Sequence, residues 1–356
     1  MMKKLKIAVI GCGGIAKNAH FPAYLKMDDV EIVAFCDVIL ERAEAAVKLF
    51  GKGVAYADYR EALKHPDLDA IDICTPNLYH SEIAVAALNA GLHVFCEKPD
   101  AVSVEECMKM KAAAEKSGKI LMVMRNNRYL ATSTYLKSFI ADGKMGEIYA
   151  GRCGWQRRRG IPGRGGWFTT KALSGGGPLI DLGVHMIDLS IWLMGNPKPV
   201  AVSGCTYCKF ADSDISDSVN SDFGDRVEDG IFDVEDLAMG MIRFDNGACL
   251  QIEFSWASNV EKEEFFVELR GTKAGSKWTS SSGLNLYTEE YGKTVDMHPH
   301  SGAQAVLPHE ANLRHFADVL LRGATPMFTP DQGLDMIGIL EAMYRSAELG
   351  QEVRLS

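Results

Sequence analysis

The first 124 residues alternate short apolar runs with amphipathic segments, and this alternation limits the possible folds more than any other feature. Apolar runs predict strands at 6–10, 31–36, 54–56, 70–74, 93–96 and 120–124, and helices are predicted at 14–27, 40–50, 81–90 and after residue 103. Asp58, and Ser103 with Glu106 three residues later, are predicted N-caps. Short connections between alternating strands and helices are typical of parallel pairing. We therefore expect an α/β region with a doubly wound parallel sheet covered on both faces.

After residue 125 the pattern changes. Helices are predicted at 132–141 and 178–194, and strands at 148–155, 200–209, 238–244, 248–256, 265–270, 275–279 and 284–287. Asp245, Asn246 and Gly247 form a strong hairpin signal between two of these strands. The pattern favours two domains: residues 1–125, and an α+β domain over 126–356 with an open, mostly antiparallel sheet. Helices at 310–321 and 331–349 end the chain, and we expect the last to pack back on the first domain.

Charge and composition exclude several classes of function. Lys and Arg number 38 against 47 Asp and Glu, and this net charge of −9 disfavours nucleic-acid binding, which needs a basic surface. No apolar run approaches the roughly 18 residues of a membrane span, and the one near the N-terminus is too short for a signal peptide. The nine cysteines are an odd number, and several lie in apolar strands, as is typical of reduced thiols. We expect a cytoplasmic protein with no nucleic-acid or membrane partner.

A glycine-rich turn follows the first predicted strand and opens the first helix. Gly11, Gly13 and Ala16 occupy the fixed positions of a G-x-G-x-x-A pattern, and Gly14 and Ile15 lie between the last two. The first position permits the tight turn, the second lets the backbone approach a pyrophosphate, and the third keeps the helix close to the strand. Backbone N–H groups at the start of the helix would then bind the phosphates. This segment predicts a dinucleotide-binding site.

Asp37 ends the second strand, where this pattern places its acidic residue, roughly 20 residues further on. Its carboxylate can accept hydrogen bonds from both hydroxyls of the adenosine ribose and would repel a phosphate on that ribose. NAD is therefore favoured over NADP, unless Arg42 folds back from the next helix. The alternative interpretation of Asp37 is a solvated loop aspartate.

Polar residues also follow the strand at 70–74. Thr75, Asn77 and His80 lie there, and the carboxyl ends of parallel strands line the ligand crevice of such a sheet. We predict cofactor contacts at these residues, with Asn77 reaching a ribose or the carboxamide. Helix capping is the alternative role for Asn77.

Glu97, Lys98 and Pro99 end the next strand at the same edge. We place Glu97 with the cofactor-binding residues, and Pro99 makes a cis peptide bond a hypothesis here. The Lys98 ammonium would point into the crevice where the nicotinamide lies, donate to a substrate oxygen and lower its pKa. A surface lysine paired with Glu97 is the alternative.

The helix at 178–194 carries the densest group of polar residues. Asp181 and His185 are four positions apart and share one helix face, while apolar residues fill most other positions. Polar groups on a buried helix need partners or a cavity. The two can serve as an acid–base pair with His185 poised near neutral pH. A satisfied histidine–aspartate hydrogen bond in the core is the alternative.

Together, these segments make the chain similar to the glucose–fructose oxidoreductase / inositol dehydrogenase / rhizopine-catabolism (Gfo/Idh/MocA) family. The resemblance covers essentially the whole chain and rests on the glycine-rich turn with Ala19-His20-Phe21-Pro22, on Thr75-Pro76-Asn77, on Glu97-Lys98-Pro99 and on the helix with Asp181, His185 and Asp188. It implies a Rossmann domain, an α+β domain with an open sheet, and NAD(P)-dependent oxidoreduction of sugars, cyclitols or related alcohols. It also implies that Lys98, Asp181 and His185 occupy the catalytic positions. Homodimers or homotetramers through the open sheet face are a further implication.

The loop at 156–166 is rich in Arg and Gly and is predicted to shape the substrate site. Aromatic faces stack on sugar rings, and Arg binds hydroxyls or an anionic group. The predicted ligands of a carbohydrate or polyol substrate are Arg125, Trp155, Arg157, Trp167 and the three catalytic residues. A solvated loop or an oligomer contact is the alternative.

The implied reaction is hydride transfer between nicotinamide and a secondary alcohol. His185 takes the hydroxyl proton, Asp181 orients His185, and Lys98 stabilises the developing alkoxide. Two alternatives use the same fold: an NAD-retaining glycosidase or epimerase, and a sugar-sensing regulator without turnover. The acidic stretch at 212–236 lacks the spacing of a calcium loop and is interpreted as a solvated insertion, and no metal site is predicted.

Overall fold

The computed structural model describes residues 4–216, 218–300 and 306–355 of the 356-residue chain. Asp217, in the acidic stretch, lies outside the described residues. The chain divides into two compact units, Met1–Asn126 with Val306–Ile337, and Asn127–Ala305 with Gly338–Ser356. Residues 306–337 therefore belong to the first unit although they follow most of the second in the sequence.

The first unit contains a six-stranded sheet in which every pairing is parallel. Its strands are β1 (Leu5–Ile10), β2 (Val30–Cys36), β3 (Val54–Tyr56), β4 (Ala70–Ile73), β5 (His93–Cys96) and β6 (Leu121–Val123), in the order β3-β2-β1-β4-β5-β6. The predicted parallel sheet is confirmed, and each strand bound lies within one residue of its prediction. The strand order reverses between β1 and β4, where the ligand crevice of such a sheet forms.

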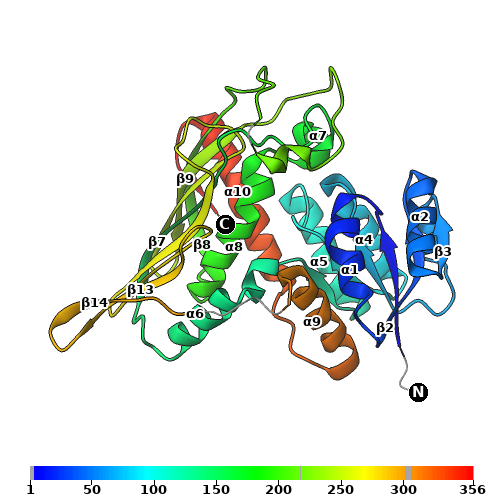
Figure 1. Ribbon diagram of the computed structural model, residues 1–356, viewed down its shortest axis with the longest axis horizontal. Coiled ribbons are helices and arrows are strands. Elements are labelled where there is room, and N and C mark those ends of the chain that lie inside the picture. The colour runs from blue at the N-terminus through cyan, green and yellow to red at the C-terminus, as the bar shows by residue number, and fades with distance from the viewer. Residues whose placement is uncertain (1–3, 217, 301–305, 356) are drawn as a thin grey trace. The chain divides into compact units, whose positions relative to one another are not determined.

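Helices of the first unit pack on this sheet. They are α1 (Phe21–Tyr24), α2 (Leu40–Phe50), α3 (Tyr59–Ala62), α4 (His80–Asn89), α5 (Val104–Ser117) and α9 (Pro308–Arg322), with the 3-10 turn η2 (Asn77–Tyr79). Helices α4 and α5 pack against each other, and α1 packs against β2 and α9 (Figure 1). Asp58 accepts the Arg60 N–H at the start of α3, and Ser103 accepts the Glu106 N–H at the start of α5. Both predicted N-caps are confirmed.

The helical segment after β1 departs from regular α-helical geometry. Ala16–His20 forms a π-helical turn, η1, which runs directly into α1. π-helical turns are rare in proteins overall, but those that occur are often found at functional sites. His20 closes the turn with a fully buried side chain, so a polar ring enters the interior of the first unit here.

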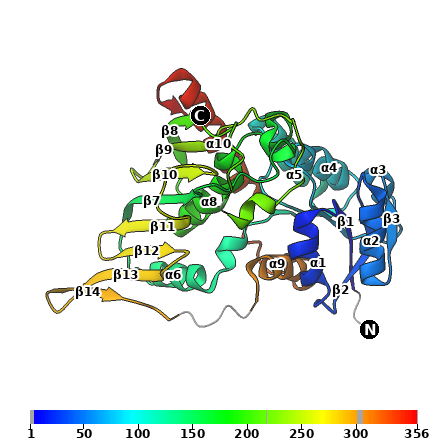
Figure 2. The same cartoon turned by 45° about the horizontal axis from the view of Figure 1, so that its top comes forward.

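The second unit contains a nine-stranded sheet. Its strands are β7 (Ile148–Gln156), β8 (Pro199–Tyr207), β9 (Leu237–Phe244), β10 (Cys249–Ser255), β11 (Glu264–Gly271), β12 (Gly275–Thr279), β13 (Gly283–Glu290), β14 (Lys293–Met297) and β15 (Val353–Arg354). They lie in the order β14-β13-β12-β11-β7-β10-β9-β8-β15, most of which can be followed in Figure 2. All pairings are antiparallel except that of β7 with β10, so the mostly antiparallel sheet is confirmed. The predicted hairpin joins β9 to β10.

Helix α8 (Val184–Leu193) packs on β7 and β11 and covers one face of this sheet (Figure 1). It continues a second π-helical turn, η5 (Leu179–Gly183). The other helices are α6 (Ala131–Ala141), α7 (Lys171–Ser174) and α10 (Pro330–Leu349), with 3-10 turns η3 (Asn126–Tyr129), η4 (Trp167–Thr169) and η6 (Val219–Asp222). The division between the two units falls within α10.

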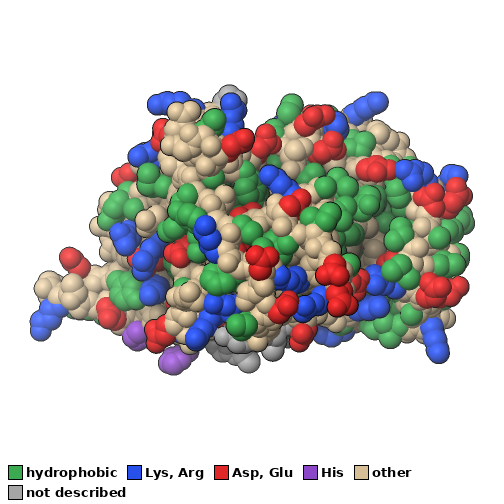
Figure 3. All heavy atoms as spheres, turned by 90° about the horizontal axis from the view of Figure 1, so that it is seen from above, with side chains coloured by type: hydrophobic (Ala, Val, Ile, Leu, Met, Phe, Trp, Pro, Cys, Tyr) green, Lys and Arg blue, Asp and Glu red, His purple; other side chains and the backbone are tan. Residues whose placement is uncertain are grey.

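Among the described residues, no helix combines the length and the apolar character that crossing a membrane requires. On the face drawn in Figure 3, Lys and Arg side chains are interspersed with Asp and Glu side chains. That face therefore carries mixed charge rather than a single basic patch.

Candidate active site

The glycine-rich turn between β1 and η1 has the backbone geometry that its sequence requires. Gly11 has a φ of +97°, and a Cβ on this residue would lie 2.6 Å from the backbone of Cys74, so only glycine fits. A Cβ on Gly13 would meet no atom within 4 Å, so this residue borders open space. Ala16 is fully buried, and its small side chain lets the helix lie close to the sheet. These features fit a dinucleotide held by residues 11–16.

Asp37 is buried beside this turn. Its Oδ2 accepts the Cys12 N–H at 2.8 Å, and its Oδ1 accepts the Ile39 N–H at 2.9 Å. The side chain of a solvated loop aspartate would be exposed, whereas Asp37 is 8% exposed, so that alternative is wrong. Each carboxylate oxygen has a second lone pair, so it can also accept a ribose hydroxyl.

The turn after β4 lies against Gly11. Thr75 Oγ1 is buried and has no hydrogen-bond partner among the described residues, which leaves a polar atom available to a ligand. Asn77 is buried. His80 is fully buried, with Nδ1 2.8 Å from the Pro99 carbonyl oxygen and Nε2 3.0 Å from that of Thr75. Because both ring nitrogens face these carbonyls, His80 joins the turns after β4 and β5 and can act on a cofactor only through them.

The segment after β5 presents Lys98 between buried neighbours. In residues 94–101, Lys98 is the one position that is partly exposed, and its peptide bond to Pro99 is cis, as hypothesised. Glu97 turns inward: Oε1 lies 2.8 Å from Nε2 of His20, and Oε2 accepts the backbone N–H of Lys98 at 3.0 Å. Both oxygens of Glu97 thus bind groups inside the first unit, and its role as a cofactor ligand stays a prediction.

His20, Asp72 and Cys74 lie close enough together for comparison with a metal site. Nδ1 of His20 is 2.6 Å from Asp72 Oδ2, a hydrogen-bond distance and shorter than the roughly 3.3 Å between two ligands of one zinc ion. Burial raises the pKa of the Cys74 thiol to about 12, which disfavours the thiolate that a metal needs. We interpret the cluster as a hydrogen-bonded network.

In the second unit, Asp181 and His185 lie on one partly open side of a buried helix. From residue 176 to residue 190, these are the two positions that are not buried. Asp181 lies in η5 and accepts the indole N–H of Trp256 at 3.0 Å. His185 lies in α8, with its ring centroid 6.0 Å from that of Trp155. The two side chains therefore share the side of the helix from which a substrate can approach.

Glu235 fixes the start of this helix. Its buried carboxylate accepts the N–H of Gly177 at 3.0 Å, that of Leu179 at 3.1 Å, and the hydroxyl of Tyr344 at 3.0 Å. Unpaired N–H groups and the helix dipole favour a carboxylate at this end. Burial nevertheless raises the pKa of Glu235 above its usual value, because neutral donors compensate only part of the desolvation.

The end of β7 and the loop after it hold two buried donors, Nε1 of Trp155 and Nε of Arg157, that have no hydrogen-bond partner among the described residues. Arg157 is 6% exposed, donates from Nη1 to the Gly160 carbonyl at 3.1 Å, and lies 5.3 Å from the Trp155 ring centroid. A solvated loop is thus the wrong interpretation at Arg157. Buried donors without acceptors are rare, so this pair is available to a ligand oxygen. Trp167 stacks on its neighbour Phe168.

The acidic stretch at 212–236 is anchored to this loop. The Val227 N–H donates to the Arg164 carbonyl at 3.0 Å. The middle of the stretch is exposed, as a solvated insertion would be, but Glu235 and Asp236 are buried. The interpretation as a solvated insertion is therefore wrong for the end of the stretch, where Glu235 reaches the helix that carries Asp181.

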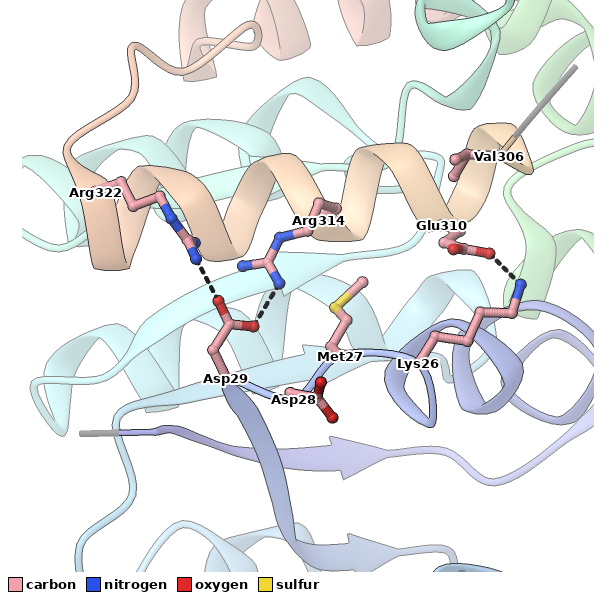
Figure 4. A pocket seen from close by; sticks show the side chains of 8 residues that line it. All are labelled: Lys26, Met27, Asp28, Asp29, Val306, Glu310, Arg314 and Arg322. Carbon is pink, nitrogen blue, oxygen red and sulfur yellow. Dashed lines mark hydrogen bonds and ion pairs between the residues drawn. The ribbon is translucent and has the colours of Figure 1, made fainter. Parts of the chain in front are cut away.

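A hollow of about 480 Å³ in the first unit lies beside α9, at the amino end of β2. Asp29 accepts hydrogen bonds from Arg314 and Arg322 there, and Lys26 donates to Glu310 at 2.6 Å (Figure 4). These charged groups pair with one another, and the hollow lies at the edge of the sheet opposite the glycine-rich turn. We do not count it as part of the candidate site.

Two protein-family models match the chain. "Oxidoreductase family, NAD-binding Rossmann fold" matches residues 5–125, and "GFO/IDH/MocA C-terminal domain" matches residues 134–276. The chain belongs to the Gfo/Idh/MocA family. It is therefore a member of a family of NAD(P)-dependent sugar and cyclitol dehydrogenases that act on CH–OH groups.

Similar proteins of this family carry names of sugar dehydrogenases. The chain is 32% identical over 352 residues to D-glucoside 3-dehydrogenase of Escherichia coli (strain K12), which covers 99% of the chain and 97% of that protein. It is 31% identical over 286 residues to levoglucosan dehydrogenase of Pseudarthrobacter phenanthrenivorans, which covers 76% of the chain and 73% of that protein. The structure of GenD2 from gentamicin A biosynthesis in complex with NAD is 27% identical, with a TM-score of 0.81 over 100% of the chain and 97% of that structure. Levoglucosan dehydrogenase in complex with NADH has the same fold, with a TM-score of 0.86, 24% identity and coverage of 99% and 100%.

Arg125 is buried, and its side chain contacts other residues of the first unit. Its guanidinium donates to Asp100 and, at 3.0 Å, to the Met124 carbonyl, and it lies 4.9 Å from the ring centroid of Phe328. The residue is 4% exposed. The prediction that Arg125 binds substrate is corrected, because these contacts make it a core ion pair of the first unit.

Sequence reasoning missed three residues that support the site: His20, Glu235 and Trp256. His20 stands in the segment on which the Gfo/Idh/MocA resemblance rests, but its spacing gives no sign of contacts with residues 72 and 97. For Glu235 a signal existed, since the glycines before Pro178 offer no side-chain cap and the helix start needed a donor-binding group from elsewhere. For Trp256 we find no such signal.

Proposed function

We propose that this family member is an NAD-dependent dehydrogenase that oxidises a secondary alcohol of a sugar, a cyclitol or a sugar derivative. The observation that carries the proposal is the placement of Asp181 and His185 on the partly open side of the buried helical segment formed by η5 and α8. A histidine beside a carboxylate, partly exposed on a buried helix, suits the removal of a hydroxyl proton near neutral pH.

In the proposed reaction, bound NAD supplies the acceptor for the hydride of the carbinol carbon. His185 removes the hydroxyl proton, so that the carbon–oxygen bond becomes a carbonyl. Asp181, held by the Trp256 indole, orients the imidazole and stabilises its charged form. Lys98 donates to the same substrate oxygen and stabilises its negative charge as the proton leaves.

The preference for NAD over NADP rests on Asp37. A ribose phosphate would lie close to its buried carboxylate, whose oxygens are held in place by the N–H groups of Cys12 and Ile39. The repulsion between the two anions supports NAD.

The donors of Trp155 and Arg157 support an uncharged substrate oxygen as the group bound beside His185. Negative charge on Asp181 and on Glu263, whose Oε1 lies 3.7 Å from Arg157 Nε, already counters the guanidinium. An additional anion would be repelled by these carboxylates, whereas a hydroxyl, ring or glycosidic oxygen accepts a hydrogen bond at no such cost. Sugars and glycosides are therefore favoured over sugar phosphates.

A homodimer or homotetramer through the face of the nine-stranded sheet stays a proposal. Large exposed side chains on β7, β8, β9 and β13 support it: Tyr149, Tyr207, Met239 and Tyr287.

The test is net NADH formation by the purified protein with a panel of pyranoses, glycosides and inositols. Saturable formation of NADH supports the proposal, and His185→Ala should remove the ascending limb of the pH–rate profile. Sugar conversion without net NADH would favour an NAD-retaining glycosidase or epimerase. Binding without turnover would favour a sugar-sensing regulator.

A further inference from the structure

Three polar side chains meet in the interior of the first unit, behind the segment that carries Lys98. His20 comes from the π-helical turn, Asp72 from β4 and Glu97 from the end of β5. Nδ1 of His20 lies 2.6 Å from Asp72 Oδ2, and Nε2 lies 2.8 Å from Glu97 Oε1. All three are buried, with exposures of 0%, 0% and 5%. Burial of this kind requires that each hydrogen bond has both a donor and an acceptor.

The geometry favours a proton on both ring nitrogens of His20. Each ring nitrogen faces a carboxylate, and an ionised carboxylate only accepts hydrogen bonds, so two ionised partners require a proton on both ring nitrogens, which makes the ring an imidazolium. Burial alone would lower the pKa of His20, but the charge and hydrogen bond of Asp72 outweigh it and raise the pKa well above its usual value. In turn, His20 lowers the pKa of Glu97 to about 2, although burial acts in the opposite direction.

Other titratable groups face the cluster and are consistent with this charge state. Cys74 Sγ lies 3.4 Å from Nδ1 of His20, and the Tyr24 hydroxyl donates to Asp72 at 3.0 Å. Lys98 adds positive potential at Glu97, and burial lowers the pKa of His309, which also faces the cluster. With two carboxylates and one imidazolium, the loss of the cation would leave two buried carboxylates without a counter-charge.

The second oxygen of Glu97 connects this cluster to Lys98. It accepts the backbone N–H of Lys98 at 3.0 Å, while His80 binds the Pro99 carbonyl at 2.8 Å from the other side. The backbone on both sides of Lys98 is thus held by buried side chains. A carboxylate that is fixed and ionised is a stronger acceptor for this N–H than a neutral carboxyl group.

We propose that His20 is a positioning residue for the dehydrogenase reaction: as an imidazolium it holds Glu97 ionised and in place, and Glu97 fixes the turn that presents Lys98. The proposal rests on the catalytic role proposed for Lys98. A neutral residue at position 20 leaves two buried carboxylates without a counter-charge, so Glu97 takes up a proton and releases the turn.

The first experiment compares His20→Gln with Tyr24→Phe, which removes a contact of Asp72 but leaves the bond between His20 and Glu97. For His20→Gln we expect kcat to fall roughly 10- to 100-fold, with the Kd for NAD little changed, because a displaced catalytic group loses rate rather than cofactor affinity. The pH–rate profile of this variant should gain an acidic limb, since Glu97 then titrates in the measurable range. Tyr24→Phe should keep both the rate and the profile. A destabilised but fully active His20→Gln protein would overturn the proposal and leave His20 a purely structural role.

A second experiment needs no turnover and covers the case in which His20→Gln does not fold. In the ¹⁵N NMR spectrum of the unaltered protein at pH 8, both ring nitrogens of His20 should carry protons. A neutral ring at this pH, or one equivalent of bound metal in the purified protein, would contradict the proposal. Lys98→Met separates the catalytic role proposed for Lys98 from the positioning role proposed for His20. Normal turnover of Lys98→Met would refute the role of Lys98. An inactive Lys98→Met protein together with a fully active His20→Gln protein would refute the positioning role alone.

Discussion

Glu97 and Glu235 are both buried carboxylates that support a proposed catalytic group, but they are compensated in different ways. Glu97, in the first unit, faces the His20 imidazolium at 2.8 Å, and its pKa is lowered to about 2. Glu235, in the second unit, is bound by two backbone N–H groups and the Tyr344 hydroxyl, and its pKa is raised by burial. Neutral donors orient a carboxylate as well as a cation does, but they do not offset its desolvation fully. The carboxylate that supports Lys98 is therefore stabilised by an opposite charge. The carboxylate at the start of the helix that carries Asp181 and His185 is stabilised by neutral donors.

The largest effect is expected at Lys98, the group that the charged cluster supports. Lys98→Met should reduce kcat roughly 100-fold or more, because Lys98 is the group proposed to stabilise the negative charge on the reacting oxygen. Steady-state kinetics and NAD titration separate this from a loss of cofactor binding. Near-normal turnover would remove Lys98 from the mechanism.

The pair Glu97→Gln and Glu235→Gln tests the comparison itself, through the pH dependence of stability. Because the pKa of Glu97 lies below its usual value of 4.5, its ionisation contributes stability above pH 4.5 that is lost as the pH falls toward 2. Glu97→Gln should thus cost about 3 kcal/mol at pH 7 and less at lower pH. The pKa of Glu235 is raised, so its contribution is present below pH 4.5 and is lost as the pH rises through the raised value. Glu235→Gln should cost about 1–3 kcal/mol at pH 7, for one N–H left without an acceptor, and more as the pH falls.

Urea unfolding of both variants and of the unaltered protein, from about pH 2.5 to about pH 8, measures these costs across both pH windows. If the free-energy cost of both substitutions changes with pH in the same direction, the comparison is wrong. If the two costs change with pH in opposite directions, Glu97 is compensated by a charge and Glu235 by neutral donors, as proposed.

A smaller effect is expected at Asp37, whose carboxylate is also bound by neutral N–H donors. Asp37→Ala should weaken NAD binding roughly tenfold and reduce discrimination against NADP. The substitution removes the carboxylate that accepts hydrogen bonds from the Cys12 and Ile39 N–H groups and from the ribose hydroxyls. Fluorescence titration with both cofactors checks this. Asp58→Ala, which removes an N-cap elsewhere in the first unit, is the matched control. Equal affinities for NAD and NADP in the unaltered protein would refute the preference.

The smallest effect is expected from Trp256→Phe, which removes the single indole hydrogen bond to Asp181. A loss of about 1 kcal/mol corresponds to about a fivefold lower kcat, and substrate KM should change little. Trp278→Phe, which alters another buried indole of the second unit, controls for packing. An effect as large as that of Lys98→Met would mean that neutral bonds in the second unit matter as much as charges in the first.

The sequence allowed much of the fold to be predicted because its signals are local. The strands of the parallel sheet, the caps at Asp58 and Ser103, and the hairpin before β10 all follow from patterns within a few residues. Strand β14 was missed because its side chains are mostly exposed and carry no apolar alternation. The Gly11 turn was identified for the same local reason, as its required φ leaves only glycine.

Contacts between distant segments account for what could not be predicted. The π-helical turns that place His20 and Asp181 have no sequence signal of their own, and the partners of His20 lie more than 50 residues away in the chain. Glu97 was assigned to the cofactor because it stands at a strand end, yet it contacts His20 in the interior, and Arg125, which was assigned to the substrate, pairs with Asp100. Glu235 was attributed to solvent because its neighbours are acidic, although tertiary burial, not composition, decides its environment.

The parallel pairing of β7 with β10 has a consequence for biosynthesis. Strand β7 is the first of its sheet to leave the ribosome, yet Ala150 pairs with Cys249, and the strand on its other side, β11, comes later still. Until those segments have been translated, both edges of β7 lack their native neighbours, which is the condition under which nascent chains associate wrongly. Productive folding should therefore benefit from chaperone binding to β7 until β10 and β11 have been translated.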